Sequence, residues 1–99
     1  MTPAEFEAKI AALAAAHPDT LGYSEFHDAV GIAGPLRRAT LAGAGHVVDV
    51  YLFQDGGAGL RLDWRWIGYE LIDYANPGIL LDDAFDRLAA AVELIVERA

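Results

Sequence analysis

The sequence predicts an α+β domain in which a small antiparallel sheet is packed on one face by an N-terminal and a C-terminal helix. Three observations predict this class. Residues 46–66 resemble a β-hairpin with a glycine-rich turn, residues 2–17 carry the signals of a capped helix, and residues 82–95 repeat apolar side chains at helical spacing. We expect two or three strands and one domain over residues 1–99, because a chain of this length supports one core.

The first helix is predicted from its capping residues. Thr2 suits the N-cap, Pro3 the first helical position, and Glu5 completes a capping box. Pro18 is expected to end the helix near His17. Its apolar face consists of Phe6, Ile10 and Leu13.

Residues 19–45 are ambiguous. The spacing of Phe26 and Val30 favours a short helix over 24–30, and Pro35 can open a second short helix over about 36–42. A strand over 35–41 is the weaker interpretation, because apolar and polar residues do not alternate there.

Residues 60–66 alternate strictly between apolar and charged side chains, which is typical of a strand with one buried face. The first strand of the hairpin is more apolar, with Val48, Val50 and Leu52 on one face. The turn offers Gly56, Gly57 and Gly59 for positive φ angles. On the second strand, the predicted core face holds Leu60, Leu62, Trp64 and Trp66, and the opposite face holds Arg61, Asp63 and Arg65.

The register of this hairpin can be argued from its charges. An odd register would bring charges onto the apolar face, so the paired residue numbers should sum to an even value. Of two even registers, one places Asp49 opposite Asp63, and the other places Asp49 opposite Arg65 and Tyr51 opposite Asp63. We expect the second, because opposite charges stabilise a cross-strand pair.

The end of the chain adds a third candidate strand and the clearest helix. Residues 67–74 are rich in aromatic and β-branched side chains, which favours a strand over a helix. In the last helix, Asp82 or Asp83 is the expected cap. Its predicted buried face consists of Phe85, Leu88, Val92 and Ile95.

The composition excludes several classes of function. The chain has no cysteine, so disulfides, thiol catalysis and cysteine–zinc sites are excluded. No apolar run reaches the ~20 residues of a membrane span, and we expect a cytoplasmic protein without membrane contact. The net charge of −8 favours basic partners and opposes non-specific nucleic-acid binding.

No residue pattern predicts catalysis or a cofactor. The histidines His17, His27 and His46 lack a second ligand at helical metal-site spacing, so no metal site is expected. The glycine-rich loop 55–59 lacks the Gly-Lys-Ser/Thr of a phosphate-binding loop. We assign no catalytic residue, and a small enzyme or ligand-binding domain with a histidine-containing pocket stays an alternative.

The leading hypothesis is an acidic domain that captures a protein partner without catalysis, as inhibitors, immunity proteins, antitoxins and adaptors do. Tyr and Arg are enriched at energetically important interface positions, and the polar hairpin face combines them with carboxylates. A homodimer is left open. The predicted partner-binding residues are Asp49, Tyr51, Arg61, Asp63 and Arg65.

An alternative follows from the order of elements. Two short helices followed by a hairpin resemble a winged helix-turn-helix, in which Arg37 and Arg38 would reach DNA. The acidic charge of the chain argues against this alternative.

Overall fold

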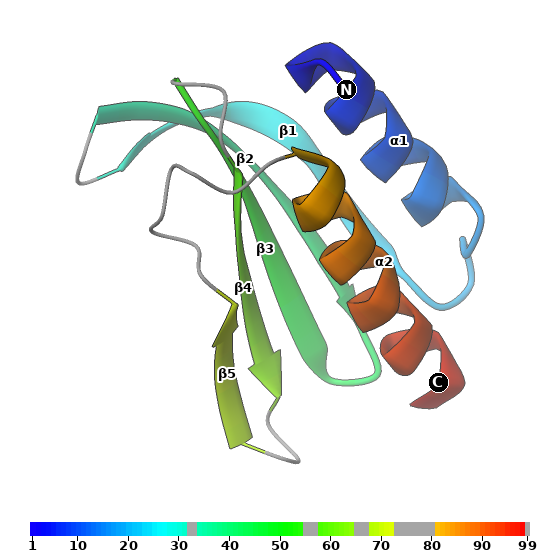
Figure 1. Ribbon diagram of the computed structural model, residues 1–99. Coiled ribbons are helices and arrows are strands. Elements are labelled where there is room, and N and C mark those ends of the chain that lie inside the picture. The colour runs from blue at the N-terminus through cyan, green and yellow to red at the C-terminus, as the bar shows by residue number, and fades with distance from the viewer. Residues whose placement is uncertain (32–33, 55–57, 65–67, 73–80, 99) are drawn as a thin grey trace.

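The computed structural model describes residues 1–31, 34–54, 58–64, 68–72 and 81–98, with only the backbone described for 59–64 and 68–72. Along the sequence, one helix precedes five consecutive strands and a second helix follows them (Figure 1). The elements are α1 (Pro3–Ala15), β1 (Gly22–Gly31), β2 (Gly34–Gly43), β3 (His46–Phe53), β4 (Ala58–Trp64), β5 (Gly68–Ile72) and α2 (Leu81–Arg98).

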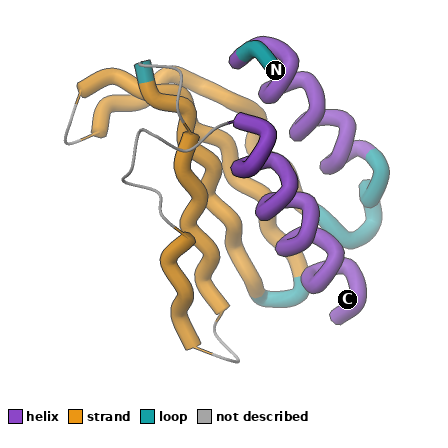
Figure 2. Tube along the Cα trace, in the orientation of Figure 1, coloured by secondary structure: helices purple, strands orange, loops and turns teal. Residues whose placement is uncertain are grey.

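The strands form one antiparallel sheet in the order β1-β2-β3-β4-β5, so each strand pairs with its sequence neighbours. Figure 2 shows the two helices side by side on one face of this sheet. The predicted α+β class, the central hairpin and the packing of both terminal helices on one face are confirmed. The sheet extends to five strands rather than the expected two or three, because residues 22–43 add β1 and β2.

The core lies between the helices and the sheet face beneath them. On β3, Val48, Val50 and Leu52 are buried, as the alternation predicted. They meet the buried apolar side chains of the two helices, which are Phe6, Ile10, Ala14, Leu81, Ala84, Leu88, Ala91, Val92 and Ile95. We call this sheet surface the covered face.

The start of α1 agrees with the prediction. The backbone N–H of Glu5 donates to the Thr2 hydroxyl oxygen at 3.2 Å, and the Thr2 N–H donates to the Glu5 carboxylate at 3.1 Å. These reciprocal bonds lower the pKa of Glu5, mainly because the Thr2 backbone donates to its ionised form. In α2, Asp82 and Asp83 lie in the first turn rather than at the cap, since the helix begins at Leu81.

The predicted helices over 24–30 and 36–42 are wrong, because these residues belong to β1 and β2. The register of β1 shifts between Ser24 and His27, which is the signature of a β-bulge. Through the bulge, Tyr23 and Phe26 both pack against the core. Two core-facing residues three positions apart on this strand therefore gave the same sequence pattern as one face of a helix. Val30, expected to be buried, is 85% exposed.

A two-residue turn joins β2 to β3. Gly43 pairs with His46, and between them Ala44 and Gly45 have φ angles of 53° and 82°. Positive φ at both central positions matches a type I′ hairpin turn, whose twist fits that of the strands. Gly43 and Gly45 therefore belong to the hairpin that joins β2 to β3.

The β3–β4 pairing confirms the even register but not the predicted partner. Asp49 pairs with Arg61, and Tyr51 with Gly59, so the expected pairs with Arg65 and Asp63 are wrong. Arg61 satisfies the opposite-charge argument as well as Arg65 does, so charge alone did not separate the two registers.

Several residues predicted for this hairpin lie at other positions in the structure or outside the described residues. Gly59 lies in β4 opposite Tyr51, not in the turn. Gly56, Gly57 and Trp66, and the Trp64 side chain, lie outside the described residues. The inward orientation of the indoles therefore stays a prediction.

The predicted strand in 67–74 is present as β5, which pairs with β4 from Leu60↔Ile72 to Trp64↔Gly68. Of the two described helices, neither combines the length and the apolar content that crossing a bilayer requires.

Candidate site on the open face of the sheet

The second face of β2 and β3 carries a polar and aromatic cluster. Residues that pair directly share a face, and here the pairs are Thr40 with Asp49, Arg38 with Tyr51, and Leu36 with Phe53. Because the helices pack on the covered face, no described helix lies over this cluster (Figure 1). We call it the open face, defined by Leu36, Arg38, Thr40, Asp49, Tyr51 and Phe53.

Asp49 is the centre of the open face. Its side chain is only 12% exposed, although it lies on the face away from the core. The Arg38 Nη2 donates to its Oδ1 at 2.8 Å, and the Thr40 hydroxyl donates to the same oxygen at 3.1 Å. The hydrogen bond to Asp49 raises the pKa of Arg38. The positive charge of Arg38 thus compensates the negative charge of this carboxylate.

The aromatic part of the open face lies beside this ion pair. The rings of Tyr51 and Phe53 stack with centroids 6.5 Å apart and planes 12° from parallel. The Arg38 guanidinium carbon lies 6.0 Å from the Tyr51 centroid, within cation–π range. Both rings are half-buried, so they present an apolar body to solvent.

Arg38 keeps hydrogen-bonding capacity. A guanidinium has five N–H donors. Within the part of the chain that the structure describes, the hydrogen bond to Asp49 is the one that Arg38 donates. Its side chain is 43% exposed. Its Nε is buried, so the donors left to meet an incoming carbonyl or carboxylate are those of the two terminal nitrogens.

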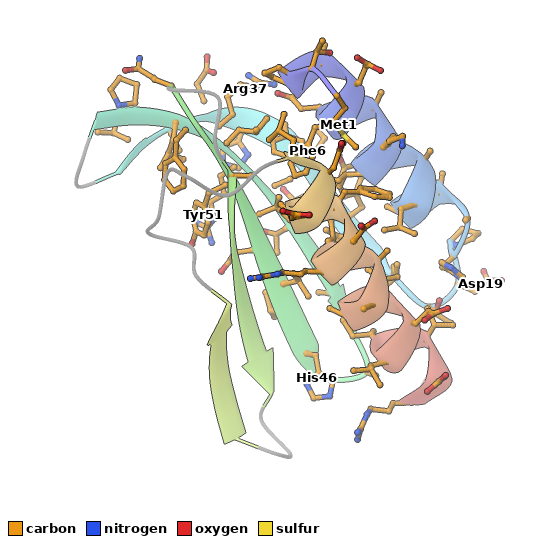
Figure 3. The ribbon with its side chains drawn as sticks, viewed as in Figure 1. Met1, Phe6, Asp19, Arg37, His46 and Tyr51 are labelled. Carbon is orange, nitrogen blue, oxygen red and sulfur yellow. The ribbon has the colours of Figure 1, made fainter. Side chains whose placement is uncertain are left out.

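Arg37, the neighbour of Arg38, belongs to the covered side. Its Nε and Nη2 donate to the two carboxylate oxygens of Glu7 at 2.7 and 2.9 Å, and its Nη1 donates to Asp28 at 2.9 Å. These bonds, to Glu7 first and then to Asp28, raise the pKa of Arg37. Figure 3 shows Arg37 beside α1, with Tyr51 farther from the helices.

The two arginines therefore do not form a common cationic patch. Each is paired with carboxylates on its own side of β2. The winged helix-turn-helix alternative also loses its structural basis, because the helices that it requires are strands.

The predicted partner-binding residues are brought together in part. Asp49 and Tyr51 lie on the open face. Arg61 pairs with Asp49, and Asp63 pairs with Val47, so their backbone positions extend this face onto β4. Arg65 lies outside the described residues.

Four residues of the open face were not among the predicted partner-binding residues: Leu36, Arg38, Thr40 and Phe53. Arg38 and Thr40 alternate along β2, and this signal becomes visible once residues 34–43 are interpreted as a strand. Arg38 had been assigned to the DNA alternative, whereas it completes the ion pair of the open face.

The three histidines belong to different segments of the fold. His46 is buried at the start of β3 (Figure 3), and His17 follows α1. On β1, the His27 Nδ1 lies 3.2 Å from the carbonyl oxygen of Glu25, to which it can donate. Within the described ranges, no three His, Asp or Glu side chains gather as metal ligands would.

Comparison with protein-family models, with curated proteins and with solved structures finds no match to this chain.

Proposed function

We propose that this protein binds a protein partner through the open face, without catalysis, as an inhibitor, antitoxin, immunity protein or adaptor does. The observation that carries the proposal is the asymmetry of the sheet. Both described helices pack on one face, and the other face presents the stacked rings of Tyr51 and Phe53 beside Arg38. Tyr and Arg are the residue types that most often dominate binding energy at protein interfaces.

The chemistry of the open face supports contact rather than reaction. Asp49 accepts hydrogen bonds from Arg38 and Thr40 on its Oδ1, so this carboxylate is engaged with groups of the protein itself. The exposed part of the cluster is aromatic surface together with free guanidinium donors. A partner that covers it would gain apolar burial around an ion pair that is already formed.

The test is affinity capture from the source cell with the whole chain as bait. Replacing both rings, Tyr51→Ala with Phe53→Ala, removes apolar contact without touching the Arg38–Asp49 pair. Hot-spot residues typically cost about 2 kcal/mol or more, so we expect loss of the captured protein. Leu94→Ala is the matched control, because Leu94 is an exposed apolar residue on α2.

Circular dichroism must show that the double variant keeps its fold. Capture that survives the loss of both rings, or that is lost equally with Leu94→Ala, would remove the open face as the binding surface.

A further inference from the structure

The outer edge of β1 is one of the two edges of the sheet, and no described strand pairs with it. β1 is an end strand of the sheet, and edge strands present backbone N–H and C=O groups on which another extended chain can pair. Natural proteins protect such edges with bulges and charges. Here the protection is confined to one half of the strand.

The protected half is the bulge. The Glu25 carbonyl oxygen lies within hydrogen-bond distance of the His27 ring, and the Phe26 carbonyl accepts from Arg37 Nη2 at 3.4 Å. The bulge also breaks the regular register between Ser24 and His27. An extended chain therefore cannot continue its pairing through this part of the edge.

The other half, from Asp28 to Gly31, is regular and open. Its register against β2 runs without interruption, and Val30 pairs with Pro35. Residues that face each other in an antiparallel ladder exchange either two hydrogen bonds or none, in alternation. Pro35 has no N–H to donate, so its pair with Val30 is of the second kind.

It follows that the N–H and C=O of Val30 point away from β2, and those of Asp28, two residues earlier, do the same. Both side chains are exposed, Val30 at 85% and the Asp28 side chain at 91%. In Figure 1 the end of the β1–β2 hairpin extends past the helices, so neither helix covers this edge.

The charges around this edge are acidic. Glu7, Asp28 and Arg37 form one ion-paired cluster, and Glu25 is exposed on the same strand. Arg37 pairs with Glu7 and Asp28, and Glu25 adds a third carboxylate to this strand and its neighbours. The net charge of the chain, −8, has the same sign. The open face, by contrast, balances Arg38 against Asp49.

We infer that residues 28–31 of β1 accept an extended, basic segment of the protein partner as an additional strand of the sheet. This inference rests on the proposed function, since it names how that partner is recognised. Backbone hydrogen bonds to Asp28 and Val30 supply the pairing, the Val30 side chain supplies an apolar contact, and the carboxylates select Lys or Arg.

The probe is a capped heptapeptide in which Lys and Val alternate, titrated into the isotopically labelled whole chain and followed by amide NMR. We expect saturable shifts at residues 28–31 and slowed hydrogen exchange at the Asp28 and Val30 amides. Val30→Pro removes one outward donor and no β2 bond, so it should weaken binding about tenfold. Val30→Ala keeps the N–H, so it should weaken binding no more than about threefold.

A second experiment tests the inference even if the Val30→Pro variant does not fold. The same peptide with alternate backbone nitrogens methylated cannot donate to the edge, and a peptide with Glu in place of Lys reverses the charge. Both should bind the unaltered chain at least about tenfold more weakly. Equal binding by either peptide would overturn the inference.

Two further outcomes would also overturn it. Amide chemical-shift changes at residues of the open face would mean that the peptide does not bind at the β1 edge. Self-association of the chain that Val30→Pro abolishes would mean that a second copy pairs there instead. The Tyr51→Ala, Phe53→Ala variant should bind the peptide normally, so failure of the proposed open face is distinguishable from failure of the edge.

Discussion

Arg37 and Arg38 are neighbours in sequence, yet they work on opposite faces of β2. Arg37 pairs with Asp28 on β1 and also with Glu7 on α1, so one of its contacts joins the sheet to the helix layer. Arg38 reaches Asp49 on the adjacent strand, so its contact lies within the sheet. One arginine helps to hold the fold together, and the other shapes a surface.

The comparison extends from these two residues to the whole sheet. The covered face excludes water with apolar side chains from both helices, whereas the open face meets solvent with an ion pair and two rings. Substitutions on the covered face should therefore change stability, and those on the open face should change binding more than stability.

The largest expected effect tests this division directly. Phe6 is fully buried on the covered face and packs against Phe26, with ring centroids 6.4 Å apart. Phe6→Ala removes this contact and leaves a cavity, so we expect a loss of about 3–5 kcal/mol in the free energy of unfolding. Tyr51→Ala on the open face should cost about 1–2 kcal/mol. Urea denaturation measures both, and equal losses would contradict the division.

A smaller loss of stability is expected from adding a Cβ at two glycines, which lie on opposite faces of the sheet. A Cβ on Gly43 would meet the Thr20 carbonyl oxygen, and it would lie 3.0 Å from the Ile95 Cγ2. A Cβ on Gly22 would find its nearest neighbour, the Ala42 oxygen, at 3.7 Å. Gly43→Ala should therefore cost about 1–3 kcal/mol, because backbone must move. Gly22→Ala should change stability by less than about 0.5 kcal/mol.

The same denaturation experiment decides this prediction. If Gly43→Ala unfolds at the urea concentration of the unaltered chain, the close approach of β2 to the loop after α1 is not a constraint.

Local signals explain which elements were predictable from the sequence. The capping box at Thr2 and Glu5 and the alternation of Val48, Val50 and Leu52 depend on near neighbours, and both were predicted correctly. On β1 the bulge places Tyr23 and Phe26 on the covered face at a spacing of three, which a periodicity argument assigns to a helix.

The strand β2 was missed for a different reason. Arg37 occupies a position on the covered face at which alternation would place an apolar residue. Its charge is accommodated there because Glu7, thirty residues earlier, pairs with it. Such a long-range partner is invisible in a local pattern. The open face was therefore predicted from its β3 and β4 positions, which are Asp49, Tyr51, Arg61 and Asp63, and without Arg38.

The two ion pairs should differ in their contribution to stability. Asp49 is 12% exposed and holds both Arg38 and Thr40, whereas Glu7 is 25% exposed and holds Arg37 alone. Asp49→Ala leaves two donors without their acceptor, so we expect a cost of about 2 kcal/mol, against about 1 kcal/mol for Glu7→Ala. Double-mutant cycles with Arg37→Ala and Arg38→Ala give each coupling energy, and a larger one for Glu7 would reverse this ranking.

The smallest expected effect is a dependence of stability on pH above neutrality. Tyr23 packs against the core from the covered side of β1, and burial, followed by the charge of Glu25, raises the pKa of its hydroxyl. The unfolded chain then loses this proton first as the pH rises, so the contribution of Tyr23 is complete below pH about 10 and declines above it. Tyr23→Phe has no such proton, and its free energy of unfolding should fall less steeply in urea titrations between neutral and alkaline pH. Identical slopes for the two chains would show that Tyr23 ionises as freely in the fold as in the unfolded chain.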